Sequence, residues 1–142
     1  MLDANDVAKY VIRYYYDKDI TISNLKLQKV LYFLQAQHLV STDEKLFYQD
    51  IEAWGSGPVV SEVYHKYSRF GGGSIFPRYE EERVYLSARA EEIINPLLDE
   101  LANYSSVTLM DLTLNQAPWR TTYRKHRHAI IPSYVIKNYF LD

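Results

Sequence analysis

The chain contains no cysteine among its 142 residues. Disulfides, zinc sites built from thiolates and cysteine nucleophiles are therefore excluded, and this composition is typical of a reducing compartment. No apolar run reaches the roughly eighteen residues that a membrane span needs. The N-terminal stretch MLDANDVAKY has neither the basic nor the apolar region of a secretion signal. These absences predict a cytoplasmic protein with no membrane contact.

Neither sign of charge is in large excess. Lys and Arg number 16 against 18 Asp and Glu, and the net charge is −2. Overall electrostatics therefore give no reason to expect nucleic-acid or membrane binding. Apolar residues at 47% and charged residues at 24% are typical of an ordinary globular chain. The length suits one core, so we expect residues 1–142 to form a single domain.

Tyrosine is the residue type in excess, with 14 Tyr against 5 Phe. A tyrosine joins a large apolar ring to a polar tip, so it suits half-buried positions and contact surfaces. We expect most of these rings to complete the core and its rim, and the remainder to face partners.

Apolar periodicity predicts helices in the N-terminal half. One runs from Asp3, as its N-cap, through residue 19, and a second runs from its N-cap Ser23 to about Val40. The second has apolar side chains on two nearly opposite sides. Such a helix packs on both sides, so we expect it at the centre of the domain. The two sides hold Leu27, Val30, Leu31 and Leu34, and Leu25, Tyr32, Ala36 and Leu39.

The C-terminal half also reads as helical. Residues 87–106 fit a helix that Pro96 should kink or break near Asn95. Ser106 is a suitable cap for a short helix through Leu112, and Pro132 fits the first turn of a last helix. We expect that last helix to point Val135, Ile136, Tyr139 and Phe140 inward.

Strand patterns are short. Residues 45–54 alternate roughly and predict one strand, and residues 74–87 predict one or two more around a turn, with Pro77 at an edge position or in a turn. The predicted fold class is mainly α (α+β): a compact helical domain around a central two-faced helix, with a small antiparallel β element.

The stretch EAWGSGPVV (52–60) places a tryptophan beside two glycines and a proline. Pro58 suits the first turn of a helix, and apolar residues follow at helical spacing until the glycines at 71–73. The pattern predicts a tight strand-to-helix turn in which the tryptophan ring clamps the corner to the central helix. Phosphate binding is disfavoured, because the P-loop pattern is absent and Pro58 lacks a donor. The residues expected to shape this corner are Trp54, Gly55, Gly57, Pro58 and Val60.

No constellation for catalysis stands out. The histidines are scattered, and the pair His126 and His128 lacks an acidic or cysteine partner at metal-ligand spacing. The acidic runs at 80–83 and 90–92 are typical of solvated faces, and no Gly-x-Ser-x-Gly motif is present. We therefore predict no catalytic, metal-binding or cofactor-binding residues, and a protein that is not an enzyme.

The segment RTTYRKHRH (120–128) is the one concentrated basic patch. One interpretation is contact with RNA, DNA or an acidic partner surface. The other is a solvated loop between Trp119 and the last helix. The acidic remainder of the chain and the absence of a nucleic-acid motif favour the loop.

Three stretches together resemble the Panacea domain, a family of SocA-like antitoxins and phage-associated proteins. They are ISNLKLQKVLYFLQA (22–36), DIEAWGSGPVVSEVYHKY (50–67) and DLTLNQAPWRTTY (111–123), and the similarity extends over residues 7–140. The shared features are a Leu- and Lys-rich second helix, a Trp-x-x-Gly-Pro-Val corner and a late Pro-Trp. Departures from the pattern are Ser56, Ser61 and Leu114.

The resemblance implies an antitoxin that neutralises a cognate toxin by direct contact. It also implies two related roles: a proteolytic adaptor that delivers the toxin to a protease, or a phage protein that uses the same scaffold on a host factor. A nucleic-acid-binding regulator using residues 120–128 is the alternative function, and a small enzyme is the third. We expect no separate DNA-binding segment, and the sequence does not predict an oligomeric state. The expected partner-binding residues are Tyr64, Tyr67, Trp119, Arg120, Tyr123 and Arg124.

Overall fold

The computed structural model of the chain describes residues 1–77 and 83–141. Within these residues the chain is mainly helical with short antiparallel strands, which confirms the predicted fold class. In chain order the elements are α1 (Ala4–Tyr16), β1 (Ile22–Ser23), α2 (Asn24–Thr42), β2 (Glu52–Trp54), β3 (Gly57–Val59), α3 (Ser61–Lys66), the 3-10 turn η1 (Ser68–Phe70), β4 (Ser74–Ile75), α4 (Ala88–Leu101), α5 (Ser106–Leu114), α6 (Ala117–Lys125) and α7 (Ser133–Leu141).

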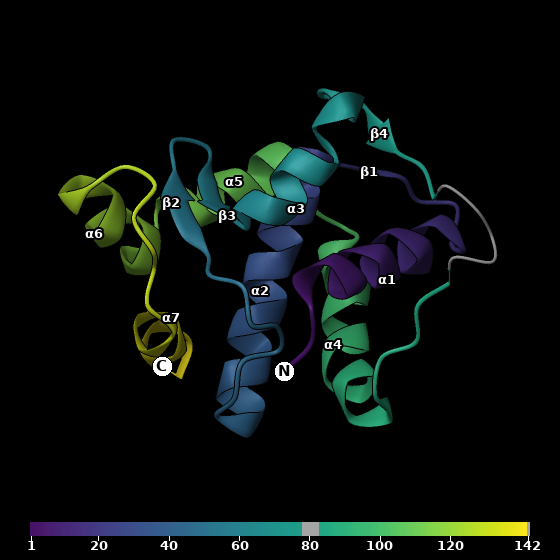
Figure 1. Cartoon of the computed structure of the whole chain (residues 1–142), viewed down its shortest axis with the longest axis horizontal. Coiled ribbons are helices and arrows are strands. Elements are labelled where there is room, and N and C mark those ends of the chain that lie inside the picture. Colours follow the sequence, from purple (N-terminus) through teal and green to yellow (C-terminus); the bar gives the residue numbers. More distant parts are fainter. Residues whose placement is uncertain (78–82, 142) are drawn as a thin grey trace.

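Helix α2 lies at the centre of the molecule, with α1 and α4 on one side and α6 and α7 on the other (Figure 1). It packs against α1, α4, α5 and α7. Leu27 and Leu34 on one of its predicted sides are buried, and so are Tyr32 and Leu39 on the other. The prediction of a central two-faced helix is confirmed.

Side-chain caps start several helices as the sequence predicts. The Asp3 carboxylate accepts the Asn5 amide at 2.8 Å, and the Ser23 hydroxyl accepts the Lys26 amide at 3.1 Å. Helix α5 is capped by Ser105, whose Oγ accepts the Thr108 amide at 3.1 Å. The prediction of Ser106 as that cap is therefore wrong by one residue.

Helix α4 runs without interruption through Pro96. Of the kink or break predicted near Asn95, the break is wrong, and Pro96 lies on the exposed side of the helix. Proline has no N–H to donate to the carbonyl of Glu92, four residues earlier. Glu92 is itself exposed, so water can replace the missing donor. The opposite side of α4 buries Ile94 and Leu98 in the core and holds the helix in place.

Two corrections concern the strands. The predicted strand 45–54 is reduced to β2, which pairs with β3 so that Ala53 faces Pro58. Pro58 therefore lies in a strand, and α3 begins only at Ser61. Strand β4 pairs with the distant β1, and residues 83–87 form no strand. The predicted turn after Pro77 and most of the acidic run 80–83 lie outside the described residues.

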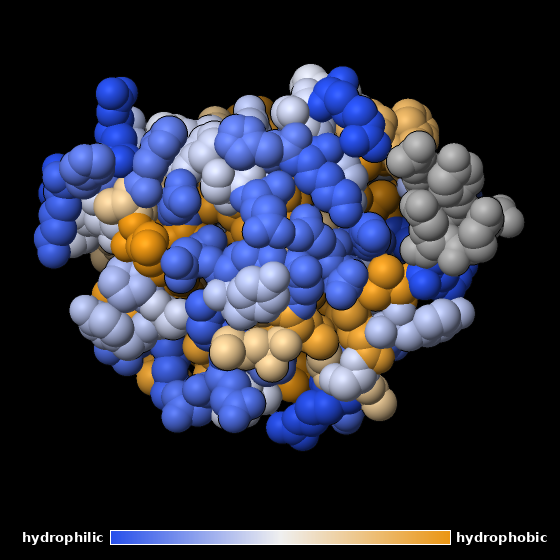
Figure 2. All heavy atoms as spheres, viewed as in Figure 1, coloured by the Kyte–Doolittle hydropathy of each residue, from blue (hydrophilic) through white to orange (hydrophobic). Residues whose placement is uncertain are grey.

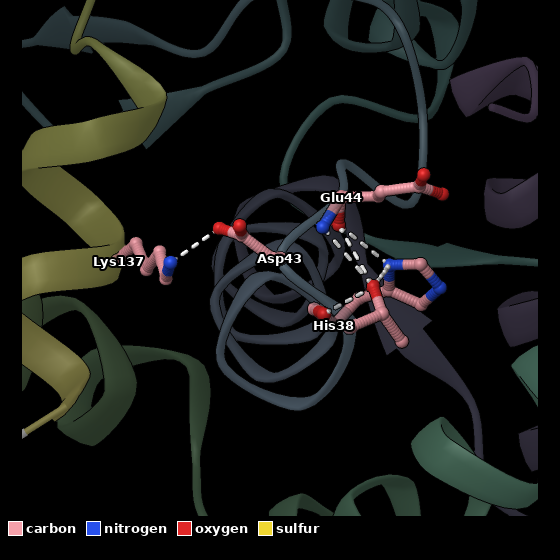
Figure 3. Close-up of polar contacts among 5 residues, drawn as sticks. His38, Asp43, Glu44 and Lys137 are labelled. Atoms are coloured by element: carbon pink, nitrogen blue, oxygen red, sulfur yellow. Dashed lines mark hydrogen bonds and ion pairs between the residues drawn. The ribbon is translucent and has the colours of Figure 1, made fainter.

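The C-terminal segments close the other side of α2. Residues 120–125 belong to helix α6, so the predicted loop is wrong there, and Pro118 occupies the first turn. In α7, Ile136 is buried as predicted, whereas Tyr139 is 40% exposed. Lys137 of α7 forms an ion pair with Asp43 (Figure 3). Asp43 is the C-cap of α2 and has a left-handed backbone conformation.

Candidate functional site

Polar side chains of α2 hold the β2–β3 hairpin and the start of α3. Asn24 Nδ2 donates to the Tyr64 carbonyl at 3.0 Å, and Gln28 Oε1 accepts the Val60 amide at 2.9 Å. Lys29 Nζ donates to the Pro58 carbonyl at 3.0 Å. Each of these bonds provides a partner for a backbone amide or carbonyl that has none within the strands or the helix. Three polar side chains of α2 therefore bind the backbone of the Gly-Pro corner and of α3.

The same helix binds the segment before the hairpin. Gln35 Oε1 accepts the Leu46 amide at 2.7 Å, and Gln35 Nε2 donates to the Phe47 carbonyl at 3.0 Å. Gln28 and Gln35 are both buried. Buried amides that bond to backbone fix one register, so the two glutamines position residues 46–60 along α2.

Lys29 is fully buried, which the sequence did not predict. Burial lowers the pKa of its ammonium from 10.5 to about 7. Gly57 lies over it with φ of +110°, and a Cβ there would lie 3.0 Å from Lys29 Cε and 2.9 Å from Thr113 Oγ1. The glycine is therefore required for both its backbone angle and its space. It lets the hairpin contact α2 and α5.

The Trp54 ring, which is predicted to clamp the corner to the central helix, makes its aromatic contacts and its hydrogen bond with residues outside that helix. It stacks on His128 with the centroids 4.5 Å apart, and it lies 5.0 Å from the ring of Tyr64. Its Nε1 donates to Glu52 at 2.9 Å. The half-buried ring thus joins α3 to the chain after α6, and Lys29 and Gln28 make the connection to α2.

Helix α6 attaches to the outer side of the hairpin turn. Trp119 Nε1 donates to the Trp54 carbonyl at 2.7 Å, and its ring stacks on Tyr123 at 4.7 Å. A Cβ on Gly55 would lie 3.5 Å from the Tyr123 hydroxyl. Among the glycines, positive φ values occur at Gly57 and Gly71.

The structure therefore brings together five of the six predicted contact residues. We call the set the hairpin–α6 surface: Tyr64, Trp119, Arg120, Tyr123 and Arg124, with Trp54 at its base. Both arginines are exposed, and the three aromatic rings are half-buried. The sixth, Tyr67, is 6% exposed and packs near Phe70, so it belongs to the core.

Among residues 1–77 and 83–141, no group of three or more His, Cys, Asp or Glu side chains is arranged to hold a metal ion. His126 and His128 are exposed, and His128 is stacked on Trp54. Of the helices described, none has the length and apolar character to cross a membrane.

Comparison with known proteins places the chain in one family. The profile of the family "Antitoxin SocA-like, Panacea domain" matches residues 27–120, which include α2 from Leu27 on, the hairpin and the start of α6. The chain is also 40% identical over 77 residues to Antitoxin SocA of Caulobacter vibrioides (strain NA1000 / CB15N). That alignment covers 54% of this chain and 41% of the relative, so the chain spans less than half of the relative's length.

No solved structure matches the chain. The family match extends over most of the elements that build the Gly-Pro corner and carry Trp119, and the residues that hold this corner to α2 lie within it. The chain belongs to the SocA-like antitoxin, Panacea domain family.

Proposed function

We propose that the chain is an antitoxin that neutralises a cognate toxin protein by direct contact through the hairpin–α6 surface. The observation that supports this is the way its aromatic rings are held. Trp119 is fixed by stacking and by a hydrogen bond to Trp54, and Tyr64 lies against the Trp54 ring. Rings that are rigid before binding lose little conformational entropy, and Tyr, Trp and Arg are enriched among residues that dominate binding.

The size of the molecule is compatible with such an interface. A standard protein interface covers about 800 Å² on each partner. This is about a tenth of the 7530 Å² accessible surface of the chain. Neutralisation by contact needs no catalytic group, only a rigid surface that blocks the toxin. The related roles of a proteolytic adaptor and of a phage protein acting on a host factor use the same kind of contact, and the proposed location is the cytoplasm.

Co-expression with the product of the neighbouring reading frame tests the proposal. We expect growth to be rescued when both proteins are present, and the two proteins to purify as a complex. Tyr123→Ala should weaken that complex by more than about tenfold, as loss of an interface aromatic does. Tyr104→Ala is the matched control, because Tyr104 is a partly exposed tyrosine beyond α4. Equal affinity of both variants and the wild type would exclude this surface.

Nucleic-acid binding by residues 120–128 is the competing function. It predicts a gel shift at low salt that weakens steeply as salt is added and is lost in Arg124→Glu. Absence of any shift at low salt excludes this function and leaves the protein-contact proposal in place.

A further inference from the structure

Positive charge is concentrated at one end of the molecule. Residues 120–128 contain four Lys and Arg and no Asp or Glu, whereas the whole chain carries −2, so the remaining residues carry −6. All four cations are exposed. Figure 2 shows strongly hydrophilic side chains at the end of the molecule that α6 forms. The four cationic residues are Arg120, Arg124, Lys125 and Arg127.

These four cations have no anionic partner within the described chain. The ion pairs there involve Arg13, Lys45, Arg83 and Lys137. No side-chain hydrogen bond of the four is present either among the described residues. Within residues 1–77 and 83–141, the fold pairs no acidic side chain with a cation of this end.

The position of Arg120 on α6 has a cost in stability. Arg120 is in the first turn of α6, which has no acidic residue, and the partial positive charge of a helix start disfavours a cation there. Arg120 and Arg124 are four residues apart, and like charges at that spacing repel by about 0.2–0.5 kcal/mol. Arg124 and Lys125 lie in the last turn, where the partial negative charge of the helix end stabilises a cation. This explains the positions of those two residues but not that of Arg120.

We propose that this cationic end of α6 binds an acidic surface of the partner protein. The inference rests on the proposed function and adds the chemistry of the partner. Acidic groups opposite these four cations would give the partner the electrostatic complementarity that raises association rates and selects among partners.

A protein is favoured over a nucleic acid because stacking within the protein already covers one face of each nearby ring. The Trp54 ring is stacked on His128, and the Trp119 ring is stacked on Tyr123. Single-stranded nucleic acids bind by stacking bases on open aromatic faces in a basic groove. The remaining net charge of −6 would also repel a polyanion longer than this patch.

The first experiment uses a decaglutamate peptide and a ten-nucleotide oligothymidylate as probes, followed by NMR at low salt. We expect the peptide to shift the amides of residues 117–128 and the Trp119 indole N–H. Arg120→Glu should abolish these shifts. Arg89→Glu is the matched control, since Arg89 is exposed in the first turn of α4, on the other side of α2 (Figure 1). Shifts that leave 117–128 unaffected, or oligothymidylate binding more than roughly tenfold tighter than the peptide, would overturn the proposal.

The second experiment uses the neighbour-encoded protein. Arg120→Glu should lower its affinity by about tenfold or more, chiefly through a slower association rate, and Arg89→Glu should not. The melting temperature of Arg120→Glu should equal or exceed that of the wild type, because an acidic residue favours a helix start. Wild-type binding that Arg120→Glu leaves unchanged overturns this inference and keeps the proposed function. A wild type that does not bind the neighbour removes the proposed function, and the peptide result then decides this inference alone.

Discussion

Lys29→Met should make the protein more stable at neutral pH and should reduce the dependence of its stability on pH. Burial lowers the pKa of Lys29 from 10.5 to about 7. Between these values the unfolded chain binds the proton and the folded chain does not, so the free energy of unfolding rises with pH. The slope for one group is about 1.4 kcal/mol per pH unit. At pH 7 and below, the folded state therefore bears a cost approaching about 5 kcal/mol.

Methionine keeps the unbranched stem of Lys29 and removes the ammonium. The variant also loses the hydrogen bond to the Pro58 carbonyl. Leaving a buried acceptor without that donor costs about 1–3 kcal/mol at every pH. The difference between the two effects predicts a variant that is about 2–4 kcal/mol more stable than the wild type at pH 7. At pH 9.5 the advantage should be smaller by about 3 kcal/mol.

Urea unfolding between pH 7 and pH 9.5 measures this narrowing gap. The upper limit avoids the buried tyrosines, because burial raises the pKa of Tyr15 and Tyr32 above 10.0. The tyrosines of the unfolded chain therefore lose their hydroxyl protons at a lower pH than those of the folded chain. The free energy of unfolding falls above about pH 10 for this separate reason. Lys18→Met, at an exposed lysine, controls for the loss of one charge. A constant gap between wild type and Lys29→Met over this pH range would refute the buried-ammonium account.

Three further changes test the packing of the Gly-Pro corner and the N-cap of α2. Gly57→Ala should destabilise the fold by about 2–5 kcal/mol, because the φ of +110° and the contacts with Thr113 and Lys29 both oppose a Cβ. Gly72→Ala, where a Cβ meets open space, should stay within about 0.5 kcal/mol, and equal chemical-denaturation curves for the two would contradict the packing described. Trp54→Ala should cost about 2 kcal/mol, below the 3–5 kcal/mol of a fully buried ring, and its thermal unfolding midpoint reports this. Ser23→Ala should cost about 1 kcal/mol in the same assay through the lost N-cap of α2, and an unchanged midpoint would mean that the cap contributes nothing.

The central helix could be predicted from the sequence because its signals are local. Ser23 is a strong capping residue, and apolar side chains recur on two sides of the helix that follows. The hairpin was missed although a local signal existed. Gly55 and Ser56 form a two-residue turn between short runs, which is typical of a β-hairpin. The φ of proline suits both a first helical turn and a strand, so Pro58 alone could not distinguish a helix start from a second strand.

Helix α6 was missed for a related reason. Pro118 occupies its first turn, the position expected for Pro58, while the run of basic residues after it is typical of a loop. The burial of Lys29 has no local signal. It depends on the hairpin around Gly57, which is distant in the sequence and lies over Lys29 only in the fold. Of the expected contact residues, Tyr67 lies four residues after the buried Val63, and this helical spacing is that of an inward-facing residue, so the apolar periodicity already indicated its burial.

Hydrogen exchange of the complex with the neighbour-encoded protein tests the central claim most directly, namely that the hairpin–α6 surface is the contact with the toxin. Our account predicts slower exchange in the complex at residues 52–59 and 117–128, with α4 unchanged on the other side of α2. Slower exchange confined to α1 and α4, with the hairpin and α6 exchanging as in the free protein, would contradict it.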